Sequence, residues 1–112
     1  MSEVLDAVVG ALTAGKLQTM RAYPGNQIPE LTGPSCAVSI GLMNEKENKV
    51  MVTVLSPAVL GGSVCENAAL KVGSLLEHMG SISIDGPCYY DARSDLFYMK
   101  VFVSVPVKTA EE

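Results

Sequence analysis

The sequence predicts an α+β fold, in which a single mixed or antiparallel sheet of about five strands packs with two helices in the order α-β-β-β-α-β-β. Two stretches have helical periodicity, and most of the remaining chain alternates between apolar and polar residues as strands do. Hydrophobic residues make up 48% of the chain and charged residues 18%, which is typical of a packed globular domain. At 112 residues the chain is long enough for one core, so we expect a single domain over 1–112.

Residues 63–80 carry the clearest helical pattern in the chain. Ser63 is placed to act as the N-cap, and Glu66 three residues later completes a capping box. Gly80 follows the last apolar position, where a left-handed residue commonly ends a helix. The apolar residues that recur at helical spacing, and are expected to be buried, are Cys65, Ala68, Ala69, Val72, Leu75, Leu76 and Met79.

The chain before this helix is expected to hold one helix and three strands. An apolar stripe over residues 4–12 predicts an amphipathic helix that ends near Gly15. Residues 17–23 alternate as a short edge strand, and the prolines and glycines of 24–34 indicate a surface loop. Two strands follow at 36–42 and 49–55, joined by a tight turn at 44–48. The first of them places Cys36, Val38, Ile40 and Leu42 on one face and small residues on the other.

A hairpin is expected after the central helix. Its strands are 81–90 and 96–107, joined by the polar turn 91–95, and Gly86-Pro87 predicts a kink or bulge in the first strand. The acidic tail at 109–112 is expected to fray. The inward-facing residues of the last strand are Phe97, Met99, Val101, Val103 and Val105.

Composition excludes several classes of function. The net charge of −4 argues against a surface built to neutralise the phosphates of nucleic acid, because nucleic-acid binders concentrate Lys and Arg. We expect no sequence-specific nucleic-acid partner. Three cysteines without a C-x-x-C pair suggest reduced thiols rather than a disulfide framework or a zinc site. No apolar run approaches membrane-spanning length, and Glu3 and Asp6 replace the cationic start of a signal peptide. We therefore expect no membrane partner.

Residues with catalytic potential have a simpler structural explanation in each case. His78 is the single histidine, so a nucleophile pair would have to join it to Cys36, Cys65 or Cys88, and no orienting third group is evident. Cysteines on apolar faces ordinarily serve as small buried hydrophobic residues. We predict no catalytic residue and no enzymatic activity.

Two further patterns point weakly to ligands. Gly61-Gly62-Ser63 precedes a helix, as many phosphate sites do, but it lacks the lysine of a Walker loop and the spacing of a dinucleotide fingerprint. The spacing of Asp85, Asp91 and Asp95 matches no ion-binding loop, and aspartate is common in turns. We predict no metal site, no cofactor site and no cofactor.

Self-association is expected instead. Leu70 and Gly73 are predicted to lie opposite the stripe of Val72 and Leu76, on the face that carries Glu77. Together with the two-sided apolar character of the last strand, this face leaves more apolar surface than one helical layer would cover.

The order of elements resembles that of the tail-terminator and tail-completion proteins of long-tailed bacteriophages and of phage-tail-like particles. Four stretches carry the resemblance, which lies in layout and hydrophobic pattern over most of the chain: VLDAVVGALTAG, AYPGNQIPELTGPSCAVSIGL, GGSVCENAALKVGSLLEHMG and ISIDGPCYYDARSDLFYMKVFVSVPV. In longer members the second and third strands are joined by an extended arm, where this chain has the short segment 44–48.

The resemblance implies a non-enzymatic virion-assembly subunit. Such subunits form a homo-oligomeric ring, typically hexameric, that caps the tail tube, ends its polymerisation and joins it to a neck, sheath or head component. They assemble in the bacterial cytoplasm and then remain in the virion or tail-like particle. A ring of this kind needs two different matching patches on each subunit. The candidates are Leu70, Gly73 and Glu77 for one patch, and Tyr89, Tyr90 and Arg93 for the other.

Two alternatives remain open. The first is a small dimeric α+β domain that binds a ligand near Gly61-Gly62-Ser63 or has a regulatory role. The second is an enzyme that uses Cys65 or Cys88 with His78.

Overall fold

The computed structural model describes residues 2–21, 31–43 and 47–106, and it confirms the predicted α+β fold and order of elements. The predicted turn at 44–48, most of the loop at 24–34 and the tail at 109–112 fall wholly or partly outside these residues. Besides the helices and strands there is one short 3₁₀ helix, η1. The elements are α1 (Ser2–Ala14), β1 (Gln18–Arg21), β2 (Ser35–Met43), β3 (Glu47–Pro57), η1 (Ala58–Leu60), α2 (Gly62–Leu76), β4 (Ser81–Asp91) and β5 (Leu96–Pro106).

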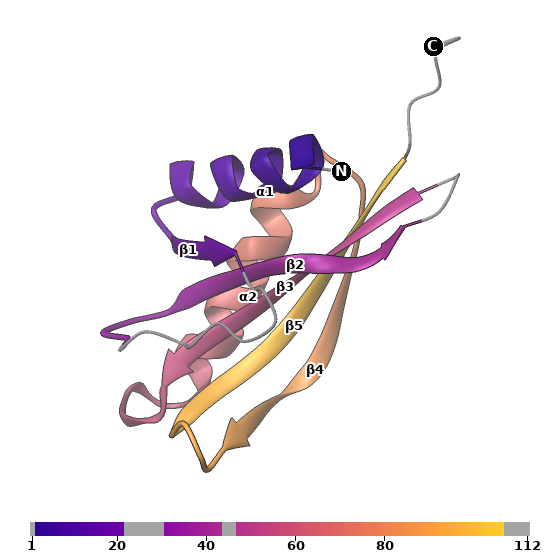
Figure 1. The fold of residues 1–112 in the computed structure, drawn as a ribbon. Coiled ribbons are helices and arrows are strands. Elements are labelled where there is room, and N and C mark those ends of the chain that lie inside the picture. Colours follow the sequence, from indigo (N-terminus) through magenta and orange to yellow (C-terminus); the bar gives the residue numbers. More distant parts are fainter. Residues whose placement is uncertain (1, 22–30, 44–46, 107–112) are drawn as a thin grey trace, which may run out of the picture.

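The five strands form one mixed sheet in the order β1-β2-β3-β5-β4. β1 runs parallel to β2, and the other neighbours are antiparallel. Both helices lie against the same face of this sheet (Figure 1). The two edges differ in length, because β1 has four residues and β4 has eleven.

The main core lies between this face and the two helices. The alternation predicted for the last strand is confirmed, since Met99, Val101 and Val103 are buried while Phe97 and Val105 pack at the margin. In register with them, Val50, Val52 and Val54 of β3 supply the centre of the sheet. The helices contribute Leu5, Val8, Leu12, Cys65, Ala68, Ala69, Val72 and Leu76.

The other face of the sheet carries no helix in the described residues. A small second cluster there consists of Ala37, Leu55 and Leu96, with Met20, Leu31 and Tyr98 packed around it. This face is therefore covered only at the end of the sheet where these side chains meet.

The N-cap of α2 lies two residues before the predicted one. Gly61, with φ of 87°, is the N-cap, and no side chain caps the helix, so the predicted Ser63 capping box is wrong. The reason is η1, whose last turn is closed by the Gly61 N–H donating to the Ala58 carbonyl at 3.0 Å. Gly61 can take this left-handed conformation without a Cβ penalty, and the helix begins directly after it.

The end of α2 also differs. The helix ends at Leu76, and a turn follows in which the Met79 N–H donates to the Leu76 carbonyl at 2.9 Å. Gly80 is not among the described glycines with positive φ, so its predicted role as a left-handed cap is wrong. Its position instead reflects close packing, because a Cβ at Gly80 would collide with the backbone carbonyl of Ser104.

The irregularity predicted at Gly86-Pro87 is confirmed. The β4–β5 ladder is regular from Ser81 to Asp85 and shifts register before it resumes at Tyr89. No helix in the described part of the chain has the length and apolar content needed to cross a membrane.

Two glycine substitutions separate close packing from helix propensity. We expect Gly80→Ala to lower the free energy of unfolding by more than about 2 kcal/mol, because the backbone of Ser104 must move away. Gly10→Ala is the matched control. Gly10 is an exposed position of α1 where an added methyl group would meet no other atom within 4 Å, so the change should raise stability by about 1 kcal/mol. Urea unfolding measures both values, and a neutral Gly80→Ala would contradict the close approach.

Candidate interaction surface

Most of the exposed large apolar side chains belong to three elements, α2, β4 and η1. In the described residues, the large hydrophobic side chains that remain exposed lie in α2, β4 and η1, with Ile40 of β2 as the exception. They are Val59, Leu60, Leu70, Ile84, Tyr89 and Tyr90. Leu70, Tyr89 and Tyr90 among them were proposed from the sequence as subunit contacts.

The outer flank of α2 carries Leu70, whose side chain is 62% exposed. Glu77 is also exposed, just past the end of the helix. Gly73 is buried, so the prediction that it shares an exposed face with Leu70 is wrong. A Cβ at Gly73 would lie 3.4 Å from Ile82 Cγ2 and 3.5 Å from Ile84 Cδ1, so this glycine faces β4 and lets the helix pack closely against it.

The hairpin end carries the second predicted group. Tyr89 and Tyr90 are both exposed, but they lie on opposite faces of the sheet because they are adjacent in β4. Tyr89 stacks on Tyr98 with ring centroids 5.5 Å apart, and Tyr90 packs against Phe97 at the same distance. These cross-strand pairs fix both rings while their outer surfaces face solvent.

Hydrogen bonds hold the turn between β4 and β5 in one shape. The Tyr90 hydroxyl donates to Asp95 Oδ1 at 2.7 Å, which raises the pKa of the tyrosine because its protonated form makes the bond. Ser94 donates to Asp91 Oδ2 at 2.7 Å, which lowers the pKa of that carboxyl. The backbone N–H of Arg93 also donates to Asp91, and its exposed side chain stands on an ordered turn.

Val59 and Leu60 were missed by the sequence analysis, which treated this segment as a connecting loop. Val59 is 88% exposed and Leu60 is 41% exposed. The Ala58 N–H donates to the Asp95 carbonyl at 3.1 Å, so η1 is joined to the hairpin turn. The sequence signal that could have identified them is the pair of apolar residues between Pro57 and Gly61. Val59 and Leu60 add to the exposed side chains at this end of the sheet. We call this group, which has side chains on both faces of the sheet, the hairpin patch: Val59, Leu60, Tyr89, Tyr90 and Arg93.

The thiols do not form a nucleophilic site with His78. Burial raises the pKa of Cys36 to about 12. Burial, together with the nearby Cys88 thiol, also raises the pKa of Cys65 to about 12, and the Cys65 thiol donates to the Val54 carbonyl at 3.6 Å. His78 is exposed beyond the far end of α2, and the helix rises about 16 Å between Cys65 and Leu76 alone. The structure therefore does not bring His78 to Cys65.

The other two weak ligand patterns have structural roles. A Cβ at Gly62 would lie 3.7 Å from the Phe97 ring and 3.8 Å from Cys88 Sγ, so the first turn of α2 rests on the sheet. Asp91 and Asp95 organise the hairpin turn, whereas Asp85 stands opposite Lys100 in the sheet. In the described residues no three metal-binding side chains converge.

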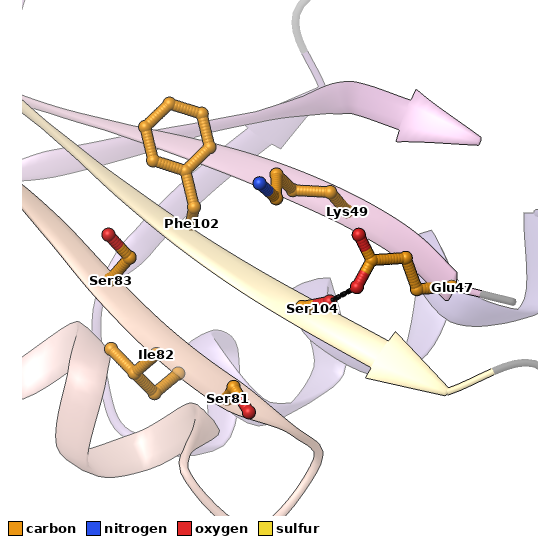
Figure 2. A pocket seen from close by; sticks show the side chains of 7 residues that line it. All are labelled: Glu47, Lys49, Ser81, Ile82, Ser83, Phe102 and Ser104. Carbon is orange, nitrogen blue, oxygen red and sulfur yellow. Dashed lines mark hydrogen bonds between the residues drawn. The ribbon is translucent and has the colours of Figure 1, made fainter. Parts of the chain in front are cut away.

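A shallow hollow of about 280 Å³ lies near the opposite end of β4, where β3 begins and β5 ends. Figure 2 shows Lys49 and Phe102 beside it, and the Lys49 ammonium lies 6.0 Å from the centre of the Phe102 ring. The Ser104 hydroxyl donates to Glu47 at its edge. Its remaining lining residues are Ser81, Ile82 and Ser83.

No protein-family model matches the chain, and no curated protein is significantly similar to it.

The buried thiols make stability depend on alkaline pH. The pKa of Cys36 and Cys65 rises from an ordinary 9.0 to about 12, so the unfolded chain loses these protons first. The contribution is fully present below pH 9 and is lost as pH rises toward 12, by up to about 1.4 kcal/mol per pH unit for each thiol. Urea unfolding between about pH 8 and about pH 10.5 should show a smaller loss in Cys36→Ala than in the native chain. Equal slopes would contradict this assignment, since the other groups titrate in both proteins.

Proposed function

We propose that the chain is a structural subunit of a phage or phage-tail-like particle, without catalytic activity. In this proposal its copies form a ring, hexameric as in the proteins that it resembles, which caps the tail tube and ends its polymerisation. The ring then joins the tube to a neck or head component, or closes it. It would assemble in the bacterial cytoplasm and remain in the finished particle.

One observation supports this proposal most strongly: the exposed apolar side chains lie in α2, η1 and β4 rather than being scattered. Exposed apolar side chains concentrated on neighbouring elements of a small domain commonly mark protein contacts. The hairpin patch is also ordered by Tyr–Tyr and Tyr–Phe packing and by the Asp95 hydrogen bond. An ordered patch loses little side-chain entropy when a neighbour docks on it.

A closed ring needs contacts between two different patches on each subunit. The flank of α2 with Leu70 and Glu77 is one candidate, and the hairpin patch is the other. Leu70 lies about 12 Å along the helix from Gly62, which packs beside the hairpin strands, so the two candidates occupy separate places. Arg93 and Glu77 carry opposite charges, which would favour a head-to-tail orientation.

The overall charge suits a ring around DNA that must pass through. With a net charge of −4, the subunit has little capacity to neutralise phosphates, so a channel of such subunits would not grip the duplex.

The alternative of a small dimeric ligand-binding or regulatory domain is favoured by the hollow beside Phe102. Its volume of about 280 Å³ is at the lower end of the range for small-molecule pockets. The hollow is lined by residues of β3, β4 and β5, so it does not coincide with the Gly61-Gly62-Ser63 turn, where this alternative places the ligand. Gly62 instead faces Phe97 and Cys88.

Charge substitutions on α2 test the ring. Leu70→Asp should leave the chain folded but reduce assembly at least about tenfold, since a carboxylate would be desolvated at the contact. Asn67→Asp adds the same charge at another exposed position of α2 and should assemble normally. Leu76→Asp buries a charge in the core and should prevent folding. Light scattering gives the particle mass, and electron microscopy of tail tubes assembled with each variant gives tube length.

The proposal fails if the native chain stays monomeric or dimeric at high concentration and leaves tube length uncontrolled. Normal assembly of Leu70→Asp would show that the flank of α2 is only solvated surface.

A further inference from the structure

β4 is a long edge strand with one unpaired side. It lies at the end of the strand order and, among the residues that the structure describes, pairs with β5 alone (Figure 1). A free strand edge presents unpaired N–H and C=O groups, which favour the addition of another strand. Natural proteins usually block such edges with lysine, proline or a bulge.

The first half of β4 has none of these blocking devices. Residues Ser81–Asp85 form a regular ladder with β5, and the segment contains no proline and no cationic residue. The irregularity begins only after Asp85, where Gly86 and Pro87 interrupt the register. Pro87 has no N–H to donate, so a strand added from outside would be confined to this five-residue segment.

We propose that two copies of this chain pair antiparallel through residues Ser81–Asp85, about a two-fold axis at Ser83. A two-fold axis perpendicular to the sheet keeps the helices of both copies on the same side, and it places one residue of β4 opposite its own equivalent. Ser83 is the centre of the regular segment, so this register uses the segment fully. Ile82 then lies opposite Ile84 of the second copy, and Ile84 lies opposite Ile82.

The helix side of this junction is apolar. Ile84 is 37% exposed and Ile82 is partly buried, although both approach Gly73 of α2. In the paired form four isoleucines would form a continuous apolar strip between the two α2 helices. Leu70 lies on the same flank of α2 as Gly73, three residues away, and would border this strip.

The opposite side of the junction carries small side chains, and its charged groups do not repel each other. Ser81 and Ser83 leave room for a second strand, and Asp85 is the single charged residue of the segment. In this register Asp85 lies opposite Ser81 of the second copy, whose hydroxyl can donate to the carboxylate. The two Asp85 carboxylates stand about 13 Å apart along the strands, so like charges do not face each other.

A second copy is favoured over an unrelated strand because the segment is complementary to itself. Its Ser-Ile-Ser-Ile alternation matches isoleucine with isoleucine and serine with a polar residue in one register. This contact is additional to the head-to-tail contacts of a ring and does not depend on the tail-capping function.

Paired cysteine variants test the register. Ser83→Cys places two thiols directly opposite each other, whereas Ser81→Cys leaves them about 13 Å apart on the same strands. Both serines are exposed on the same face of β4, so the variants are matched. With a short bifunctional maleimide and protein at about 10 µM, Ser83→Cys should form covalent dimers on the order of 100-fold faster than Ser81→Cys. The reason is that opposed thiols have an effective concentration on the order of millimolar.

Rates are measured on denaturing gels and corrected for the unsubstituted chain, which contains the native thiols. Equal rates for the two variants, or no dimer above the unsubstituted chain, would overturn the pairing. The test needs no tail tube. If Ser83→Cys crosslinks but the chain fails to cap tubes, the edge contact is supported and the ring is opposed. If the chain caps tubes but Ser83→Cys does not crosslink, the ring is supported and the edge contact is opposed.

Discussion

The close packing of α2 on the sheet is the constraint on which the rest of the structure depends. The helix contacts the sheet mainly through small residues, and valines of β3 and β5 face them across the core. The small residues of α2 are Cys65, Ala68, Ala69 and Gly73. Short side chains on both surfaces bring the backbones near each other, and Gly73 allows the isoleucines of β4 to contact the helix. β4 has no other strand beyond it, so these contacts and the β5 ladder hold it in place. An added methyl group at Gly73 would meet these isoleucines at ordinary van der Waals distance, so only a side chain larger than that of alanine would press on β4.

Periodicity alone was sufficient to predict the elements, because the core side of each element is distinctly apolar. The stripe of α2 and the alternation of β5 both follow from burial on a single face, and burial is what such patterns record. The register shift after Asp85 was also predictable, since a proline within a strand removes a ladder hydrogen bond. These features depend on residues near in sequence, and for that reason no knowledge of the tertiary structure was needed.

Two of the errors share one physical cause, which is contact between segments distant in sequence. Gly80 was interpreted as a helix cap, but its small size is required by the Ser104 carbonyl, 24 positions later. Gly73 was assigned to an exposed face, yet Ile82 and Ile84 cover it from β4. Ser63 was interpreted as a cap because the 3₁₀ turn before Gly61 leaves no periodicity to detect. Of the predicted contact residues, Leu70, Glu77, Tyr89, Tyr90 and Arg93 are exposed.

The architecture also explains why the uncovered surface lies where it does. Two helices cover one face of the sheet, and α1 packs toward β1 and β2 while α2 packs toward β3, β5 and β4. Nothing in the described chain lies beyond β4, so the outer flank of α2 and the outer edge of β4 have no further layer. Within a single subunit, Ile84 and Leu70 cannot both be removed from water without an additional helix or strand. Both side chains therefore stay exposed in the described part of the subunit, beside the regular segment Ser81–Asp85, where the proposed strand pairing would bury Ile84 and border Leu70.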